Sequence, residues 1–184
     1  MTATTTITPT LAHGAWTVDP SHSSVEFQVK HLGIATVKGF FSDFEGSLEV
    51  SEEGKIRASG SIKAASVNTR EPQRDEHLHS ADFFDADNYP ELRFQSKSVE
   101  QLDEDSYRIV GDLTIRGVTR EVELDAVTEG VERDPWGNTR LGLEVVGQID
   151  REDFGLTWNR ALESGGVLVG KKVKILLDLS AVKA

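Results

Sequence analysis

The sequence predicts an all-β protein, an extended antiparallel barrel of eight strands with one short helix near residues 69–84. Three observations indicate this fold. Apolar and polar residues alternate with a period of two along most of the 184 residues, as is typical of half-buried strands. Only residues 68–90 carry convincing helix signals. No strand–helix–strand rhythm, tandem repeat or change of composition occurs, so sequential strands joined by turns are expected.

Length and composition indicate one domain. A chain of 184 residues can bury a core without staples. The sequence contains no cysteine, which excludes disulfides and Cys-based metal or redox sites. A formal charge of −11 and a pI near 4.9 argue against nucleic acid and anionic membrane surfaces as partners.

The first residues do not resemble a targeting segment. Residues 1–14 are rich in Thr and have neither a basic start nor an apolar run, so we expect a disordered lead-in rather than a signal peptide. The barrel domain is expected at residues 15–184. No stretch approaches the about 20 apolar residues of a membrane span, and a cytoplasmic protein is therefore expected.

The first strands are read from alternation. Residues 24–31 place Val25, Phe27, Val29 and His31 on one apolar face, which predicts a half-buried strand. The second strand, residues 37–50, contains adjacent phenylalanines that cannot both face inward unless a bulge at a neighbouring glycine shifts the phase. The third strand, residues 56–64, has small inward residues that leave room inside a barrel.

Residues 68–90 predict the helix. Asn68 and Glu71 are spaced as a variant of the capping box, and Pro72 lies early, where its missing N–H costs least. Phe83 and Phe84 follow as an apolar plug before a turn. One short helix with an aromatic tail, set among strands, is typical of a lid on a sheet or barrel.

The second half of the chain supplies the remaining strands. Alternation recurs from residue 92, over 107–115, 122–126 and 141–149, and in a last strand over 167–179 whose apolar phase is interrupted by Lys171. Closing eight strands removes exposed edges. The interior of such a barrel is either packed solid or holds one small ligand. Inward glycine, alanine and serine among large aromatics favour a cavity.

Five segments resemble one known family. Residues 19–27, Asp-Pro-Ser-His-Ser-Ser-Val-Glu-Phe, followed by Lys-His-Leu at 30–32, resemble the opening signature of the YceI-like family of lipocalin-like, polyisoprenoid-binding barrels. The other four segments are residues 74–90, similar to its helix motif; 111–119, similar to its central hairpin; 150–155, similar to its late corner; and 169–175, similar to its last strand. The resemblance spans Trp16 to Val182 in the same order.

The resemblance implies a long lipocalin-like barrel with a helix beside its mouth and an isoprenoid chain inside. Two departures from the family pattern stand out. Lys171 and Lys172 occupy positions where acidic residues are expected, which alters the charge of the mouth. Many members are secreted, whereas this sequence shows no signal peptide.

Two sets of residues are candidates for ligand contact. The apolar lining is expected to include Phe27, Val29, Leu78, Phe83, Phe84, Phe94, Leu113 and Trp158, and the alternative is a packed core made of the same side chains. A diphosphate or other polar head would need donors at the mouth. The head-group candidates are Arg74, Arg160, Lys171 and Lys172, with His31 and Asn159 as neutral donors; solvated surface charge is the alternative for each.

Catalytic and metal motifs are sparse. The sequence has no His-Glu-x-x-His, no Gly-x-Ser-x-Gly and no Cys ligand. A cluster of His22, His31 and His77 across a strand pair and the helix is the one metal or catalytic arrangement to weigh, and structural histidines are the alternative. No catalytic residue and no metal is predicted.

Taken with the resemblance, these features predict a non-enzymatic carrier, store or sequestering protein. The expected ligand is an isoprenoid lipid, such as a polyprenyl diphosphate or a quinone tail, and no cofactor is expected. Two alternatives stay open: an enzyme or metal site at the mouth histidines, and a packed structural module that contacts a protein partner. A homodimer is also left open.

Overall fold

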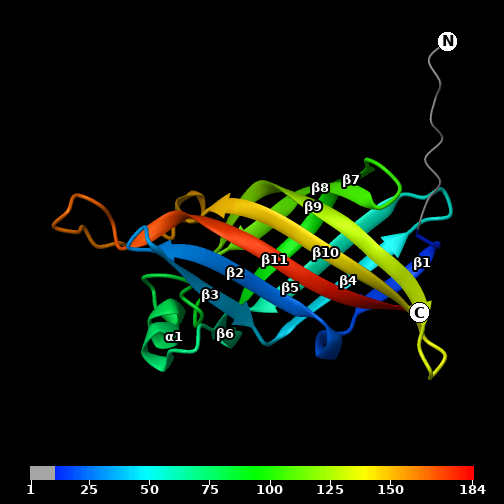
Figure 1. Ribbon diagram of the computed structural model, residues 1–184, viewed down its shortest axis with the longest axis horizontal. Coiled ribbons are helices and arrows are strands. Elements are labelled where there is room, and N and C mark those ends of the chain that lie inside the picture. Colours follow the sequence, from blue (N-terminus) through cyan, green and yellow to red (C-terminus); the bar gives the residue numbers. More distant parts are fainter. Residues whose placement is uncertain (1–10) are drawn as a thin grey trace, which may run out of the picture.

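The computed structural model describes residues 11–184 and is dominated by one antiparallel sheet that closes on itself (Figure 1). The elements are β1 (Gly14–Val18), η1 (Pro20–His22), β2 (Ser24–His31), β3 (Ala35–Phe41), β4 (Phe44–Val50), β5 (Ile56–Lys63), η2 (Ala64–Ser66), β6 (Val67–Asn68), α1 (Pro72–His79), β7 (Glu91–Gln101), β8 (Ser106–Ile115), β9 (Val118–Arg133), β10 (Thr139–Asp150), η3 (Arg151–Phe154) and β11 (Val169–Lys183).

The barrel is closed by β1, which pairs with β4 on one side and with β11 on the other. β1 and β2 both pair with β11, so they are two halves of one wall strand interrupted at η1. On the other side of this wall strand, β2 pairs with β3 and β1 pairs with β4. Next in the sheet, β3 pairs with β6 and β4 pairs with β5. The wall therefore consists of eight long antiparallel strands, and the predicted all-β, eight-stranded lipocalin-like barrel is confirmed.

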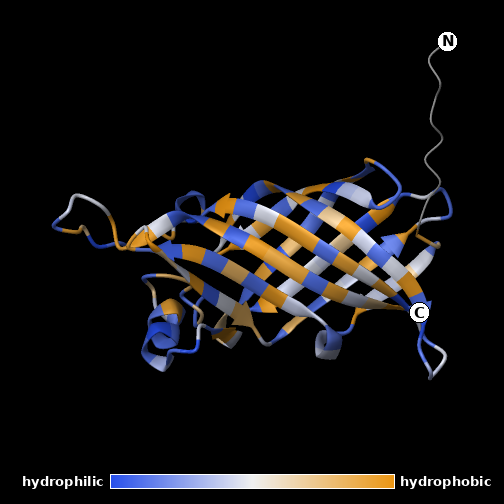
Figure 2. Cartoon of the chain, viewed as in Figure 1, coloured by the Kyte–Doolittle hydropathy of each residue, from blue (hydrophilic) through white to orange (hydrophobic). Residues whose placement is uncertain are grey.

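Figure 2 shows the alternation that carries this fold as bands of hydrophobic and hydrophilic residues crossing the strands. α1 lies beside one end of the barrel, next to β3 and β6, and the long loop before β11 projects from that same end (Figure 1). The C-terminus and β1 lie at the other end. We call the first end the helix end and the second the closed end.

The ordered chain begins earlier than the expected start at residue 15. Leu11 is buried against the core that contains Trp16, and the Trp16 indole N–H donates to the Ala12 carbonyl at 3.2 Å. β1 starts at Gly14. Residues 11–14 are thus part of the barrel, while the prediction for residues 1–10 lies outside the described residues.

The helix is shorter than predicted and has a different cap. α1 runs over Pro72–His79 rather than 69–84, and residues 81–84 form turns. The Glu71 carboxylate, not Asn68, accepts from the first turn, at 2.6 Å from the Arg74 N–H. Asn68 accepts instead from the Arg70 N–H at 2.8 Å. Local hydrogen bonding by Asn competes with helical capping at this position.

Two irregularities interrupt the strands. The single strand predicted over 37–50, with a bulge at a neighbouring glycine, is instead two strands, because a break at residues 42–43 separates β3 from β4; Phe41 is buried at the end of β3. In β11 the pairing with β2 shifts between Val169 and Val173. Lys171 and Lys172 are exposed within this bulge.

The buried residues form two clusters. One surrounds Trp16, Tyr107 and Leu141 at the closed end. The other surrounds Phe83 and Phe154 at the helix end, where the aromatic tail of α1 packs as the predicted plug. Between the clusters the inward side chains are only half-buried, and this central region is the candidate site.

Candidate functional site

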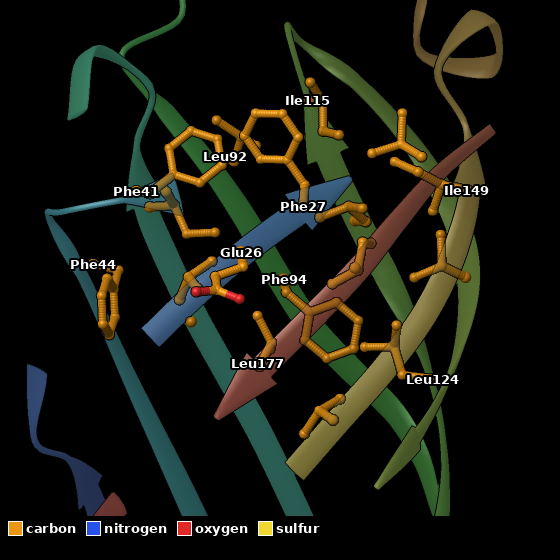
Figure 3. Close-up of a pocket in the computed structure, with 18 of the residues that line it drawn as sticks. Glu26, Phe27, Phe41, Phe44, Leu92, Phe94, Ile115, Leu124, Ile149 and Leu177 are labelled. Atoms are coloured by element: carbon orange, nitrogen blue, oxygen red, sulfur yellow. The ribbon is translucent and has the colours of Figure 1, made fainter. Parts of the chain in front are cut away.

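A cavity of about 470 Å³ lies inside the barrel (Figure 3). It extends from Leu11 and Ala181 at the closed end to Thr69 and His77 at the helix end. Almost all of its wall is aliphatic or aromatic. Since the interior holds unfilled space of this size, the alternative of a solidly packed structural module does not fit this protein.

Alternation along the strands builds this wall. β11 contributes Val173, Ile175, Leu177 and Leu179, every second residue, and all four are half-buried rather than buried. Side chains that point into a closed barrel would be buried if the interior were filled. Their partial exposure therefore reflects the cavity that they face.

Glycines opposite large side chains keep the lumen open. Phe27 on β2 pairs with Gly39 on β3, and a Cβ at Gly39 would collide with the Phe27 ring. The Phe94 ring on β7 lies over Gly111 on β8, its diagonal neighbour, because Phe94 itself pairs with Leu113. Neither glycine lines the cavity, because the rings cover them. The rings thus lie against the wall instead of standing across the lumen.

Aromatic contacts join α1 and its tail to the barrel at the helix end. The Phe41 ring centroid lies 5.6 Å from that of Phe27 and 5.8 Å from that of Phe84. The Trp158 ring lies 5.5 Å from Phe83 and 4.6 Å from His77. Such tilted or edge-on pairs add stability beyond the apolar area that they bury. This end of the cavity is therefore bounded by two groups of contacting rings, one around Phe41 and one around Trp158.

Arg74 is an exposed cationic side chain in the cavity wall at this end, as is Lys30. Its Nε donates to the Thr69 hydroxyl and its Nη2 to the Thr69 carbonyl, both at 2.7 Å. Thr69 is buried, and its N–H and hydroxyl donate to Asp75 at 2.8 and 2.6 Å. The remaining Arg74 N–H groups make no hydrogen bond to residues 11–184 and can donate to an anionic ligand.

Arg151 is a buried cation without a carboxylate partner in hydrogen-bond contact. Its side chain is 4% exposed and donates to four backbone carbonyls, those of Leu156, Trp158, Val169 and Gly170, at 2.6–3.3 Å. Burial lowers the pKa of its guanidinium, while the nearby carboxylates raise it in part. An arginine stays protonated even so. It ties the loop that carries Trp158 to the start of β11.

Most of the predicted lining residues face the cavity. Those in its wall are Phe27, Val29, His31, Leu78, Phe83, Phe84, Phe94, Leu113 and Trp158. Their contact with a ligand stays a prediction. Figure 3 shows Phe27, Phe94 and Leu177 around the central part of the lumen.

The other proposed polar contacts lie away from the wall. The Asn159 amide bonds to the backbone of Val169 at 2.8 and 3.0 Å, so its polar atoms hold the loop instead of facing the lumen. Lys171 and Lys172 point to Glu152 and Asp150 on the outside, at 3.3 and 3.7 Å. Arg160 is exposed on the projecting loop and does not line the cavity.

The three histidines do not form one cluster. His22 contacts Asp19 at 2.9 Å on η1, and His77 contacts Asp82 at 2.8 Å beside α1. His31 lies at the end of β2, about 30 Å of extended chain beyond His22. Among residues 11–184 no three His, Asp or Glu side chains are placed to hold a metal ion. The metal and catalytic alternative therefore finds no support in the geometry.

Sequence reasoning missed several parts of the site. Arg151 was recognised only as part of a motif, because its four carbonyl partners come from segments whose fold the sequence does not reveal. The pairing of Phe27 with Gly39 depends on strand register. The lining also reaches Leu11 and Leu179, and for Leu179 the alternation in the last strand was the available signal.

No helix within residues 11–184 is long and apolar enough to cross a membrane.

Comparison with known proteins agrees with the geometry. The YceI-like domain model matches residues 16–181. The UPF0312 protein SA2479 of Staphylococcus aureus (strain N315) is 41% identical over 162 residues, which cover 86% of this chain and 92% of that protein.

Solved structures show the same fold. A Campylobacter jejuni YCEI protein is 32% identical and has a TM-score of 0.72, with 84% of this chain and 90% of that chain covered. Burkholderia cenocepacia BcnA, at 21% identity, has a TM-score of 0.77 and covers 89% and 98%. A polyisoprenoid binding domain from Saccharophagus degradans, at 15% identity, has a TM-score of 0.72 and covers 94% and 100%. With a family match over nearly its full length, the chain belongs to the YceI-like domain family.

Proposed function

We propose that this protein binds an isoprenoid lipid in the barrel cavity and acts as a carrier, store or sequestering protein without catalysing a reaction. The observation that carries the proposal is the apolar, unfilled lumen of about 470 Å³. Pockets that bury a small-molecule ligand typically have volumes of about 300–1,000 Å³. The polyisoprenoid binding domain with the same fold supports the choice of ligand class.

The walls can supply the affinity. Burying about ten chain carbons at roughly 0.8 kcal/mol each gives on the order of 8 kcal/mol of favourable free energy. Alone this would correspond to a dissociation constant near 1 μM, and the freedom lost by the ligand offsets part of it. Longer prenyl chains are therefore expected to bind more tightly than short ones until the lumen is full.

A polar head is expected at the helix end. Arg74 has free N–H groups there, and Thr69 fixes the direction of its guanidinium through two hydrogen bonds. A bidentate contact to a phosphate or diphosphate suits this arrangement. The Asp75 carboxylate accepts from the N–H and the hydroxyl of Thr69. It therefore orients Thr69 and makes no direct hydrogen bond to Arg74.

The absence of catalysis is part of the proposal. Two titratable groups in the cavity wall are already engaged: His77 with Asp82, and Arg151 with backbone carbonyls. The sequence contains no recognisable nucleophile–base pair. The family to which the chain belongs is known for binding.

Organic extraction of the purified protein, followed by mass spectrometry, tests for a co-purifying prenyl lipid. The extracted protein is then titrated with farnesol and geranylgeraniol. Saturable binding near one ligand per chain supports the proposal, and the absence of both a co-purified prenyl lipid and prenol binding contradicts it.

A pair of variants on β5 locates the bound ligand. Ala58 faces the lumen and is half-buried, so Ala58→Phe fills space that the ligand needs. Arg57 is its exposed neighbour, and Arg57→Phe adds the same ring outside the barrel. Farnesol binding should be lost only in Ala58→Phe. Equal affinity in both variants would place the ligand elsewhere.

A further inference from the structure

Large aliphatic side chains are exposed at the helix end of the barrel. Ile34 is 83% exposed, Val167 47% and Leu32 40%. Leu32 and Ile34 lie in the turn between β2 and β3, and Val167 lies in the loop before β11, which projects beyond the strand ends (Figure 1). We call these three residues the aliphatic tip.

The backbone holds the tip in place. The Leu32 N–H donates to the Leu168 carbonyl at 2.9 Å, which joins the two loops. The Ile34 N–H donates to the His31 carbonyl at 3.2 Å, and Val167 pairs with Ala161 in an isolated bridge. Leu32 adopts a left-handed conformation, with φ of 56°, which L-residues with large side chains rarely do. The exposure is therefore a feature of ordered turns rather than of loose chain.

The tip lies next to the cavity. Residues directly beside it, Lys30, His31, Leu168 and Val169, line the cavity wall. The exposed Arg74 lies at the same end. A ligand that leaves or enters at this end therefore passes beside the tip.

We propose that the aliphatic tip docks onto the surface of a zwitterionic lipid bilayer, so that the cavity meets the lipid from which its ligand comes. This inference rests on the proposed function. An isoprenoid chain is poorly soluble in water, and direct contact with a bilayer spares the apolar chain a passage through solvent.

Shape and charge favour a lipid surface over a protein partner. The tip is formed by separate aliphatic side chains on protruding turns, as in peripheral insertion at an interface, and it lacks the aromatic and arginine anchors that dominate protein interfaces. The chain carries a net charge of −11, which disfavours anionic lipids. The two loops themselves are not acidic overall, with Arg160 and Glu163 as the charged residues of residues 159–168.

Co-sedimentation with phosphatidylcholine vesicles tests the proposal. The wild-type chain should partition onto the vesicles, and Ile34→Ser should weaken this partitioning by about tenfold, as expected when one large aliphatic side chain no longer inserts. Trp136 is the matched control, because it is 82% exposed on the turn at the closed end. Trp136→Ser should leave partitioning unchanged.

Three results would overturn the proposal. The first is a wild-type chain that stays in solution with the vesicles present. The second is an equal loss for Trp136→Ser and Ile34→Ser. The third is a dimeric solution mass for the wild-type chain that Ile34→Ser reduces to that of a monomer, which would assign the tip to contact with a second copy.

A separate measurement distinguishes this inference from the proposed function. In vesicle-free solution Ile34→Ser should bind farnesol with wild-type affinity, while its transfer of farnesol from vesicles should slow by about tenfold, in proportion to the lost partitioning. A wild-type chain that binds vesicles but no farnesol would contradict the proposed function alone. Wild-type transfer rates in Ile34→Ser would contradict the inference alone.

Discussion

Adding one methyl group at Gly39 should push an aromatic ring into the lumen. The Phe27 ring lies over this glycine, and a Cβ at residue 39 would lie only 2.5 and 2.9 Å from two carbons of that ring. Carbon atoms in contact prefer about 3.5–4.0 Å, so the ring must move by about 1 Å or more. The wall strands are fixed by pairing on both sides, whereas the lumen is empty, and the ring therefore moves inward.

The size of the effect on binding can be estimated. A ring that enters the lumen excludes about two or three ligand carbons, each worth roughly 0.8 kcal/mol when buried. The expected loss is about 2 kcal/mol, or about 30-fold in the dissociation constant for farnesol. Stability should fall by only about 1 kcal/mol, the low end of the range for overpacking, because the displaced ring finds open space.

Titration with farnesol checks this result, and a double-mutant cycle isolates its cause. In a Phe27→Ala background, Gly39→Ala should no longer change the affinity, since no ring is left to displace. Gly142→Ala serves as the control: this glycine on β10 faces away from the cavity, and an added Cβ would meet Glu129 at an ordinary 3.4 Å. Wild-type affinity in a folded Gly39→Ala, or the same loss in the Phe27→Ala background, would refute the reasoning.

The remaining expectations concern charged groups around the barrel. Arg74→Ala should weaken farnesyl diphosphate by about 10- to 100-fold, as for a lost hydrogen bond to a charged group, and leave farnesol nearly unchanged; equal losses in parallel titrations would remove Arg74 from the head-group site. Arg151→Met leaves four backbone carbonyls without their donor. It should lower the free energy of unfolding by about 3 kcal/mol, which corresponds to a melting temperature lower by roughly 6–12 °C. A loss of unfolding free energy below about 1 kcal/mol would contradict the role of Arg151 in holding the loop. Arg140 donates to Asp19 at 2.9 Å and to Asp134 at 2.8 Å. Burial raises the pKa of Asp134, but hydrogen bonds from Arg140 and from backbone N–H groups outweigh this effect and lower the pKa to about 2. The pKa of Asp19 is lowered as well, first by hydrogen bonds from Ser21 and next by a hydrogen bond from Arg140. Because both folded-state pKa values are lowered, this stabilisation is present above about pH 4 and is lost as the pH falls toward 2. The difference in melting temperature between wild type and Arg140→Gln should therefore shrink from pH 6 to pH 3, and a constant difference would refute the assignment.

The fold was predictable because its main signal is local. The alternation of apolar and polar residues along each strand indicates which side chains face inward. Closure of the sheet into a barrel follows from having eight such strands in sequence. What local patterns could not supply was the exact helix start. Asn68 and Glu71 both have capping side chains, and the choice of Glu71 depends on Asn68 being part of β6, which pairs with Phe40 far away in the sequence.

The candidate site was predictable only where it follows the same alternation. Phe27, Phe94 and the pair Phe83 and Phe84 were predicted to line the lumen because they lie in phase on strands or in the tail of the helix. Trp158 lies in the loop before β11 and follows neither pattern. Asn159 was assigned to the mouth on residue type alone, and the structure shows its amide acting in place of backbone pairing with Val169. The cross-strand partners of Phe27 and Phe94 could not be read from the sequence, since register between strands is set by the three-dimensional closure of the barrel.

These contacts between rings and glycines explain how an eight-stranded barrel with many large inward residues keeps a cavity. Such barrels can fill with their own side chains, and Phe27 and Phe94 are large enough to do so. A glycine on the neighbouring strand, opposite Phe27 and diagonal to Phe94, leaves room for each ring to lie against the wall. The packing that stabilises the fold is then concentrated in the clusters around Trp16 and Phe154 at the two ends. On the proposed function the bound prenyl chain supplies the contacts that the middle lacks, so ligand binding and stability are coupled through the same apolar surface.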